Sequence, residues 1–79
     1  MAHKILMVED DFALAMGTEY ALTSEGYAVA TAGNLAQARE KFDDSIDLVL
    51  LDVMLPDGTG FEFCKELREK NSDAPIIFL

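Results

Sequence analysis

Three short runs of consecutive apolar residues constrain the fold of this chain more than any other feature of its sequence. Polar residues do not alternate with apolar ones inside these runs, as they do in strands with one face in water. Uninterrupted apolar strands are typical of parallel sheets that helices cover on both faces. The runs are Ile5-Leu6-Met7-Val8, Leu48-Val49-Leu50-Leu51 and Ile76-Ile77-Phe78-Leu79. They predict buried parallel strands, and Tyr27-Ala28-Val29-Ala30-Thr31 predicts a weaker one after Gly26.

The segments between these strands have apolar residues at helical spacing. Residues 11–25 predict a helix that ends at Gly26, and residues 35–42 and about 60–70 predict two more. Capping residues stand at the expected starts, with Asn34 before the second helix and Thr59 before the third. The helix faces predicted to pack are Leu14, Gly17, Thr18, Ala21 and Leu22 in the first helix and Phe61, Cys64 and Leu67 in the third. The order β-α-β-α-β-α-β predicts a parallel sheet between helical layers.

Composition limits the classes of function. The 79 residues are 51% hydrophobic and 27% charged, which is typical of one globular domain at most. Six basic and 15 acidic side chains give a net charge of −9, which argues against direct binding of nucleic acid or of anionic membranes. The run of residues 5–8 is too short for a signal peptide or a membrane span. We therefore expect a cytoplasmic protein.

Acidic side chains follow two of the predicted strands. Glu9, Asp10 and Asp11 come directly after the first strand, and Asp52 comes directly after the third. Ligands of open α/β sheets bind at the carboxyl ends of the strands. Carboxylates that converge there repel one another unless a cation joins them, and Mg²⁺ prefers oxygen ligands. A carboxylate beside Mg²⁺ is also able to attack phosphorus.

The residues around these acids resemble those of response-regulator receiver domains. The matching stretches are Ile5-Leu6-Met7-Val8-Glu9-Asp10-Asp11 for the first strand and its acidic pair, Leu48-Val49-Leu50-Leu51-Asp52-Val53-Met54-Leu55-Pro56-Asp57-Gly58-Thr59-Gly60 for the phosphoacceptor strand and loop, and Ala74-Pro75-Ile76-Ile77-Phe78-Leu79 for the fourth strand. The resemblance covers residues 1–79 in the order of the family. It implies a flavodoxin-like three-layer α/β sandwich with parallel strand order 2-1-3-4.

The resemblance also implies a role for each matching residue. Asp52 would be the phosphoacceptor, which takes a phosphoryl group from a sensor histidine kinase and switches a downstream output domain or protein. Asp10 would be the main Mg²⁺ carboxylate, Glu9 would hold the metal through water, and Asp52 and the backbone carbonyl of Met54 would complete the protein ligands. Such a domain assists its own phosphorylation and dephosphorylation and is not an enzyme with a separate substrate.

The sequence stops before two groups that the resemblance implies. Receiver domains have a Ser or Thr after the fourth strand and a Lys at the end of a fifth. We therefore expect a receiver domain that is incomplete at its C-terminus, lacks the fifth strand and is phosphorylated poorly by itself. The unpaired edge of the fourth strand, 76–79, also predicts self-association.

Two other functions compete with this interpretation. The chain could be a receiver-like interaction module without phosphoryl turnover. It could also be a phosphatase of the haloacid dehalogenase type, but these enzymes usually have a second Asp two residues after the first, where this chain has Met54. Simpler roles are expected for three other positions: Asp11 in the first turn of a helix, Asp57-Gly58 in a turn, and Cys64 in the core.

Overall fold

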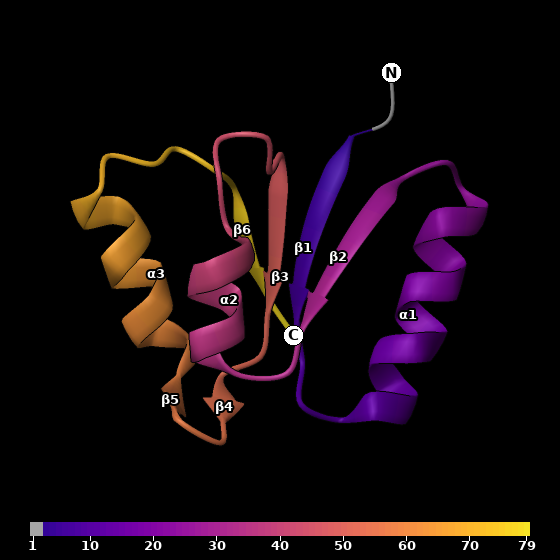
Figure 1. Cartoon of the computed structure of the whole chain (residues 1–79), viewed down its shortest axis with the longest axis horizontal. Helices are drawn as coiled ribbons and strands as arrows, with labels where there is room; N and C mark the ends of the chain where they lie inside the picture. Colours follow the sequence, from indigo (N-terminus) through magenta and orange to yellow (C-terminus); the bar gives the residue numbers. More distant parts are fainter. Residues whose placement is uncertain (1–2) are drawn as a thin grey trace.

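A computed structural model describes residues 3–79 and contains one parallel sheet between layers of helices (Figure 1). The elements of the main sheet and its helices alternate along the chain: β1 (Lys4–Val8), α1 (Phe12–Ser24), β2 (Ala28–Ala32), α2 (Leu35–Lys41), β3 (Leu48–Leu51), α3 (Gly60–Glu69) and β6 (Ile76–Phe78). Between β3 and α3, two short strands, β4 (Met54–Leu55) and β5 (Gly58–Thr59), form an antiparallel hairpin.

The main sheet has the order β2-β1-β3-β6 in the described residues, and all of its pairings are parallel. Because β6 is the fourth strand of this sheet, the predicted order 2-1-3-4 is confirmed. Figure 1 shows α1 on one side of the sheet and α2 and α3 on the other. The predicted three-layer flavodoxin-like sandwich is therefore confirmed as well.

The main core lies between the sheet and the layer of α2 and α3. It contains fully buried side chains from all three parts, with Phe63 and Leu67 from α3 and Leu35 from α2 covering Leu6 and Val49 of the sheet. Cys64 is half-buried against this core. The rings of Phe42 and Phe63 meet edge to face, with their centroids 6.2 Å apart.

The predicted packing faces of two helices were partly wrong. In α3, Leu67 is buried as predicted, but the other buried residues are Gly60 and Phe63, one position before the predicted Phe61 and Cys64, and Phe61 is 58% exposed. In α1, the buried residue is Ala15, while Leu14 is 57% exposed. Apolar residues occur around most of α1, and the sequence therefore gives no clear face for this helix.

The predicted helix boundaries were correct to within about one residue. Gly26 ends α1 with a φ of 95°, a backbone conformation that favours glycine. Asn34 caps α2, because its side-chain oxygen accepts from the backbone N–H of Gln37 at 2.8 Å. Thr59 caps α3 in the same way, from the N–H of Glu62 at 3.3 Å.

Candidate functional site

The pairing of β1 with β3 brings the predicted acidic residues together. Val8 pairs with Leu51, so the next residues, Glu9 and Asp52, leave the sheet side by side. The backbone N–H of Asp52 donates to the carbonyl of Val8 at 3.0 Å, and the N–H of Glu9 donates to Ala32 at 2.9 Å. Both residues are thus fixed by the backbone ladder before their side chains make any contact.

Three carboxylates meet at this point. Glu9, Asp10 and Asp52 each offer an oxygen, and these oxygens lie within 4.8 Å of one another. Glu9 is buried, at 7% exposure, whereas Asp10 is exposed and Asp52 is half-buried. Burial raises the pKa of Glu9 above its ordinary value, and repulsion from Asp52 and Asp10 raises it further, while the N–H of Asp11 opposes this rise.

This arrangement fits a hard divalent cation. The donor atoms are carboxylate oxygens, which are the ligands that Mg²⁺ and Ca²⁺ prefer. Burial, followed by repulsion from Asp52 and Asp10, raises the pKa of Glu9, and a bound cation would offset both effects. The residues present therefore suit such a cation.

Asp11 lies next to the carboxylate cluster but belongs to the helix. Its side chain accepts from the backbone N–H of Leu14 at 3.1 Å and caps α1. Its own N–H donates to Oε1 of Glu9 at 3.0 Å and helps to hold that carboxylate in place. The expectation that Asp11 starts the helix is confirmed, with the residue at the cap instead of in the first turn.

A cavity of about 220 Å³ opens beside the carboxylates. Its lining includes Glu9, Asp10, Gln37 and Lys41. The ammonium group of Lys41 donates to the carbonyl of Thr31 in the same lining. A second cavity, of about 290 Å³, has a mostly apolar lining that includes His3 and Tyr27 and contains none of the three clustered acids.

The segment after Asp52 forms a tight hairpin. Met54 is in β4 and pairs with Thr59, and its side chain is 69% exposed. At the base of the hairpin, the N–H of Gly60 donates to the carbonyl of Val53 at 2.7 Å. A Cβ on Gly60 would lie 2.2 Å from the carbonyl oxygen of Asp52, so only glycine fits here.

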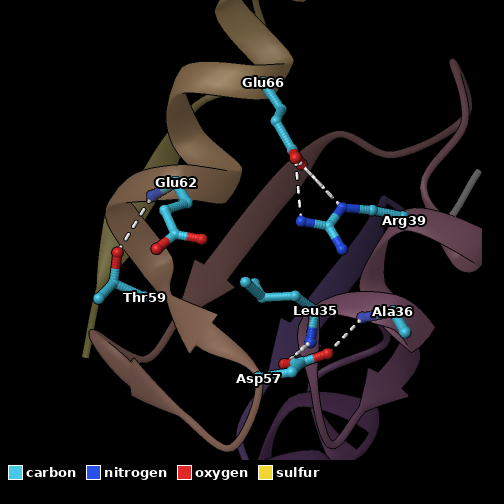
Figure 2. Close-up of polar contacts among 7 residues, drawn as sticks. All are labelled: Leu35, Ala36, Arg39, Asp57, Thr59, Glu62 and Glu66. Atoms are coloured by element: carbon cyan, nitrogen blue, oxygen red, sulfur yellow. Dashed lines mark hydrogen bonds and ion pairs between the residues drawn. The ribbon is translucent and has the colours of Figure 1, made fainter.

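Asp57, which the sequence indicated only as a turn residue, joins the hairpin to α2. Its two carboxylate oxygens accept from the backbone N–H groups of Leu35 and Ala36, at 2.7 and 3.0 Å (Figure 2). Because its partners lie more than 20 residues away in the chain, spacing in the sequence gave no signal for this contact.

Comparison with known proteins gives the family. A model of the response regulator receiver domain matches residues 5–79. The chain is 44% identical to the transcriptional regulatory protein YrkP of Bacillus subtilis over all 79 residues, and 43% identical to the transcriptional regulatory protein CpxR of Escherichia coli over 77 residues. The chain therefore belongs to the response-regulator receiver family.

Solved structures agree with this membership. The receiver domain of HemR from Leptospira biflexa superposes with a TM-score of 0.92, at 35% identity over 96% of this chain and 62% of the other. The response regulator TrrA from Thermotoga maritima, solved in complex with Mg(2+)-BeF, gives 0.88, at 37% identity over 96% of this chain and 67% of the other. The chain spans about a third of the length of the curated relatives, 34% for YrkP and 33% for CpxR.

Among residues 3–79, the helices are all too short or too polar to cross a membrane.

Proposed function

We propose that Asp52 accepts a phosphoryl group from the phosphohistidine of a sensor histidine kinase, in a site that binds Mg²⁺. The carboxylates of Glu9, Asp10 and Asp52 and the backbone carbonyl of Met54 would hold the metal. The observation that carries this proposal is the convergence of three carboxylate oxygens within 4.8 Å at the carboxyl ends of β1 and β3. The complex of the related regulator TrrA with Mg(2+)-BeF supports the choice of metal.

The residues of the chain account for the transfer step. A carboxylate oxygen of Asp52 attacks phosphorus in line as the P–N bond of the phosphohistidine breaks, and the imidazole nitrogen leaves with the electron pair and takes up a proton. Glu9 and Asp10 place negative charge beside Asp52, where it would attract the cation. Because Glu9 is buried, water screens its charge less than that of an exposed carboxylate. Bound Mg²⁺ would neutralise the charge that develops on the phosphoryl oxygens.

The proposed role is that of a phosphoacceptor domain and not of an enzyme with a separate substrate. YrkP and CpxR are transcriptional regulatory proteins about three times as long as this chain. This difference in length supports a downstream output domain or protein as the partner that phosphorylation controls. We place the activity in the cytoplasm, where such regulators meet their kinases and DNA. The net charge of −9 argues against direct binding of nucleic acid by this segment.

We also propose that the 79-residue chain self-associates through β6. This strand is at the edge of the described sheet, and Ile77, Phe78 and Leu79 are 52%, 39% and 53% exposed. The ring of Phe78 packs against that of Phe61, which is itself 58% exposed. An apolar edge strand recruits another strand, and a second copy supplies an identical one. Light scattering over a range of concentrations should show dimers, and a strictly monomeric species would contradict the proposal.

Phosphorylation with a small acyl-phosphate donor tests the proposed function. Because the chain is expected to be phosphorylated poorly by itself, intact mass after a long incubation should show one phosphoryl group on a fraction of the chain in the presence of Mg²⁺ and none after chelation. Asp52→Asn should remove it. Asp44→Asn is a suitable control, because Asp44 is exposed and is not a member of the carboxylate cluster. Mg²⁺ binding without any added phosphoryl group, also in a chain extended through a fifth strand, would instead favour a receiver-like interaction module.

A further inference from the structure

A contact between distant parts of the chain joins the hairpin to α2. The two oxygens of the Asp57 carboxylate accept from the first two backbone N–H groups of this helix, on Leu35 and Ala36 (Figure 2). Helix α2 has no acidic residue in its own first turn, so Asp57 supplies the negative charge that a helix start favours. The hydrogen bond from Leu35, and then that from Ala36, keep the pKa of Asp57 below its ordinary value.

The same surface is closely packed. At Gly58, next to Asp57, a Cβ would lie 2.7 Å from Cδ1 of Leu35, so the hairpin rests directly on the first turn of α2. At the other end of the segment, Gly60 lies against the backbone of Asp52. The segment 52–60 is thus fixed at its base by Gly60 and at its tip by Asp57.

We infer that Asp57 is a positioning residue that fixes the backbone of Met54, and thereby its carbonyl, relative to the carboxylates of Asp10 and Asp52. Met54 lies between the base of the hairpin at Asp52 and its tip at Asp57. Its position depends on the hairpin, because its side chain is exposed and does not anchor it. This inference rests on the proposed function, since it concerns the affinity of the same site for Mg²⁺. Asp57 does not touch the metal and acts only through the hairpin.

A second contact of α2, with α3 instead of the hairpin, provides a control. Nε and Nη2 of Arg39 in α2 donate to the carboxylate of Glu66 in α3, at distances of 2.9 to 3.2 Å (Figure 2). Glu66→Gln removes one negative charge, as Asp57→Asn does, and it weakens a contact of α2 with α3. It leaves the tip of the hairpin attached to α2, because Glu66 makes no contact with Leu35 or Ala36 among the hydrogen bonds of the described residues.

The experiment measures the dissociation constant for Mg²⁺ from amide shifts of Asp10 and Asp52, at about 0.15 M salt so that long-range charge effects are screened. Asp57→Asn and Asp57→Ala should raise this constant about threefold to tenfold, which corresponds to the cost of ordering roughly one loop residue on binding. Glu66→Gln should change it less than about twofold. Denaturation midpoints of the same variants separate an effect on the site from a general loss of stability.

Two further signals test the route through the hairpin. In the unaltered chain, the carbonyl ¹³C resonance of Met54 should move on addition of Mg²⁺, and the amides of Leu35 and Ala36 should be protected from exchange. Both effects should be reduced in Asp57→Asn. If the unaltered chain binds Mg²⁺ and Asp57→Asn binds it equally well, or if Glu66→Gln weakens binding as much, the inference is wrong while the proposed function stands. If the unaltered chain does not bind Mg²⁺, the proposed function fails and the inference fails with it.

Discussion

Removing the charge of Asp52 should make the metal-free protein more stable, although it destroys the proposed phosphoacceptor. In the absence of a cation, Glu9, Asp10 and Asp52 repel one another in the folded state, whereas the unfolded chain separates them. Asp52→Asn keeps the shape of the side chain and relieves two of the three repulsive pairs. Residues at functional sites often lower the free energy of unfolding.

The magnitude follows from the geometry of the carboxylate cluster. At the 4.8 Å that bounds the oxygen separations, two unit charges repel by about 0.9 kcal/mol in bulk water and about 3.5 kcal/mol at an effective dielectric constant of 20. The repulsion between Asp52 and the exposed Asp10 should be near the lower value, and that between Asp52 and the buried Glu9 should be nearer the higher one. Allowing for screening by salt, we expect Asp52→Asn to raise the free energy of unfolding by about 1–2 kcal/mol.

Urea denaturation followed by circular dichroism measures this difference, at one low protein concentration and with a chelator present. Asp44→Asn removes the same charge from an exposed position outside the cluster and should change stability by no more than about 0.5 kcal/mol. Mg²⁺ at about 100 times its dissociation constant should stabilise the unaltered protein by about 2.7 kcal/mol and Asp52→Asn by less, which would reverse or cancel the order.

Either of two results would refute this reasoning. If Asp52→Asn is no more stable than Asp44→Asn in the chelator, the three carboxylates do not store repulsion. If Mg²⁺ stabilises both variants equally, the metal does not bind at the cluster.

Three further predictions concern packing, backbone space and pH. Gly60→Ala should destabilise the fold by more than about 3 kcal/mol in urea denaturation, because its Cβ would lie 2.2 Å from a backbone oxygen; a loss below about 1 kcal/mol would contradict the close approach. Phe63→Ala should cost about 3–5 kcal/mol and Phe61→Ala less than about 1.5 kcal/mol, since the first ring is buried and the second is exposed; equal losses would contradict the orientation of α3. Asp57 has a lowered pKa in the folded state, so its contribution to stability is present above the ordinary pKa of about 3.9 and is lost as the pH falls through the folded value. Denaturation at several pH values should therefore show a steeper loss below about pH 4 in the unaltered chain than in Asp57→Asn, and parallel curves would be evidence against the contact with α2.

The strands and the acidic cluster were predictable because their signals are local. Three apolar runs and one weaker segment defined the strands, and the parallel order of the sheet then placed the residues after β1 and β3 at one edge. Glu9 and Asp52 needed no other information to be brought together. The position of Met54 was not predictable in this way, because it depends on a hairpin that the sequence indicated only as a turn.

The packing faces and the contact of Asp57 were not predictable, for two physical reasons. In α3, Phe61, Cys64 and Leu67 follow one another in steps of three, whereas Phe63 and Leu67 are four residues apart, and only the tertiary structure selects Phe63. The partner of Asp57 is the start of a helix 22 residues away, and the contact depends on how the hairpin lies on α2. Both features are set by packing between elements, about which a single sequence carries little information.

The most direct test of the proposed function is to locate the phosphoryl group after reaction with a small acyl-phosphate donor. The donor and Mg²⁺ are added to the chain, the aspartyl phosphate is trapped by chemical reduction, and the modified residue is identified by fragmentation of peptides. We expect one modification, at Asp52, that requires Mg²⁺ and decreases in Asp10→Asn. Modification of another residue, or modification of Asp52 that is equally fast in a chelator, would contradict this expectation.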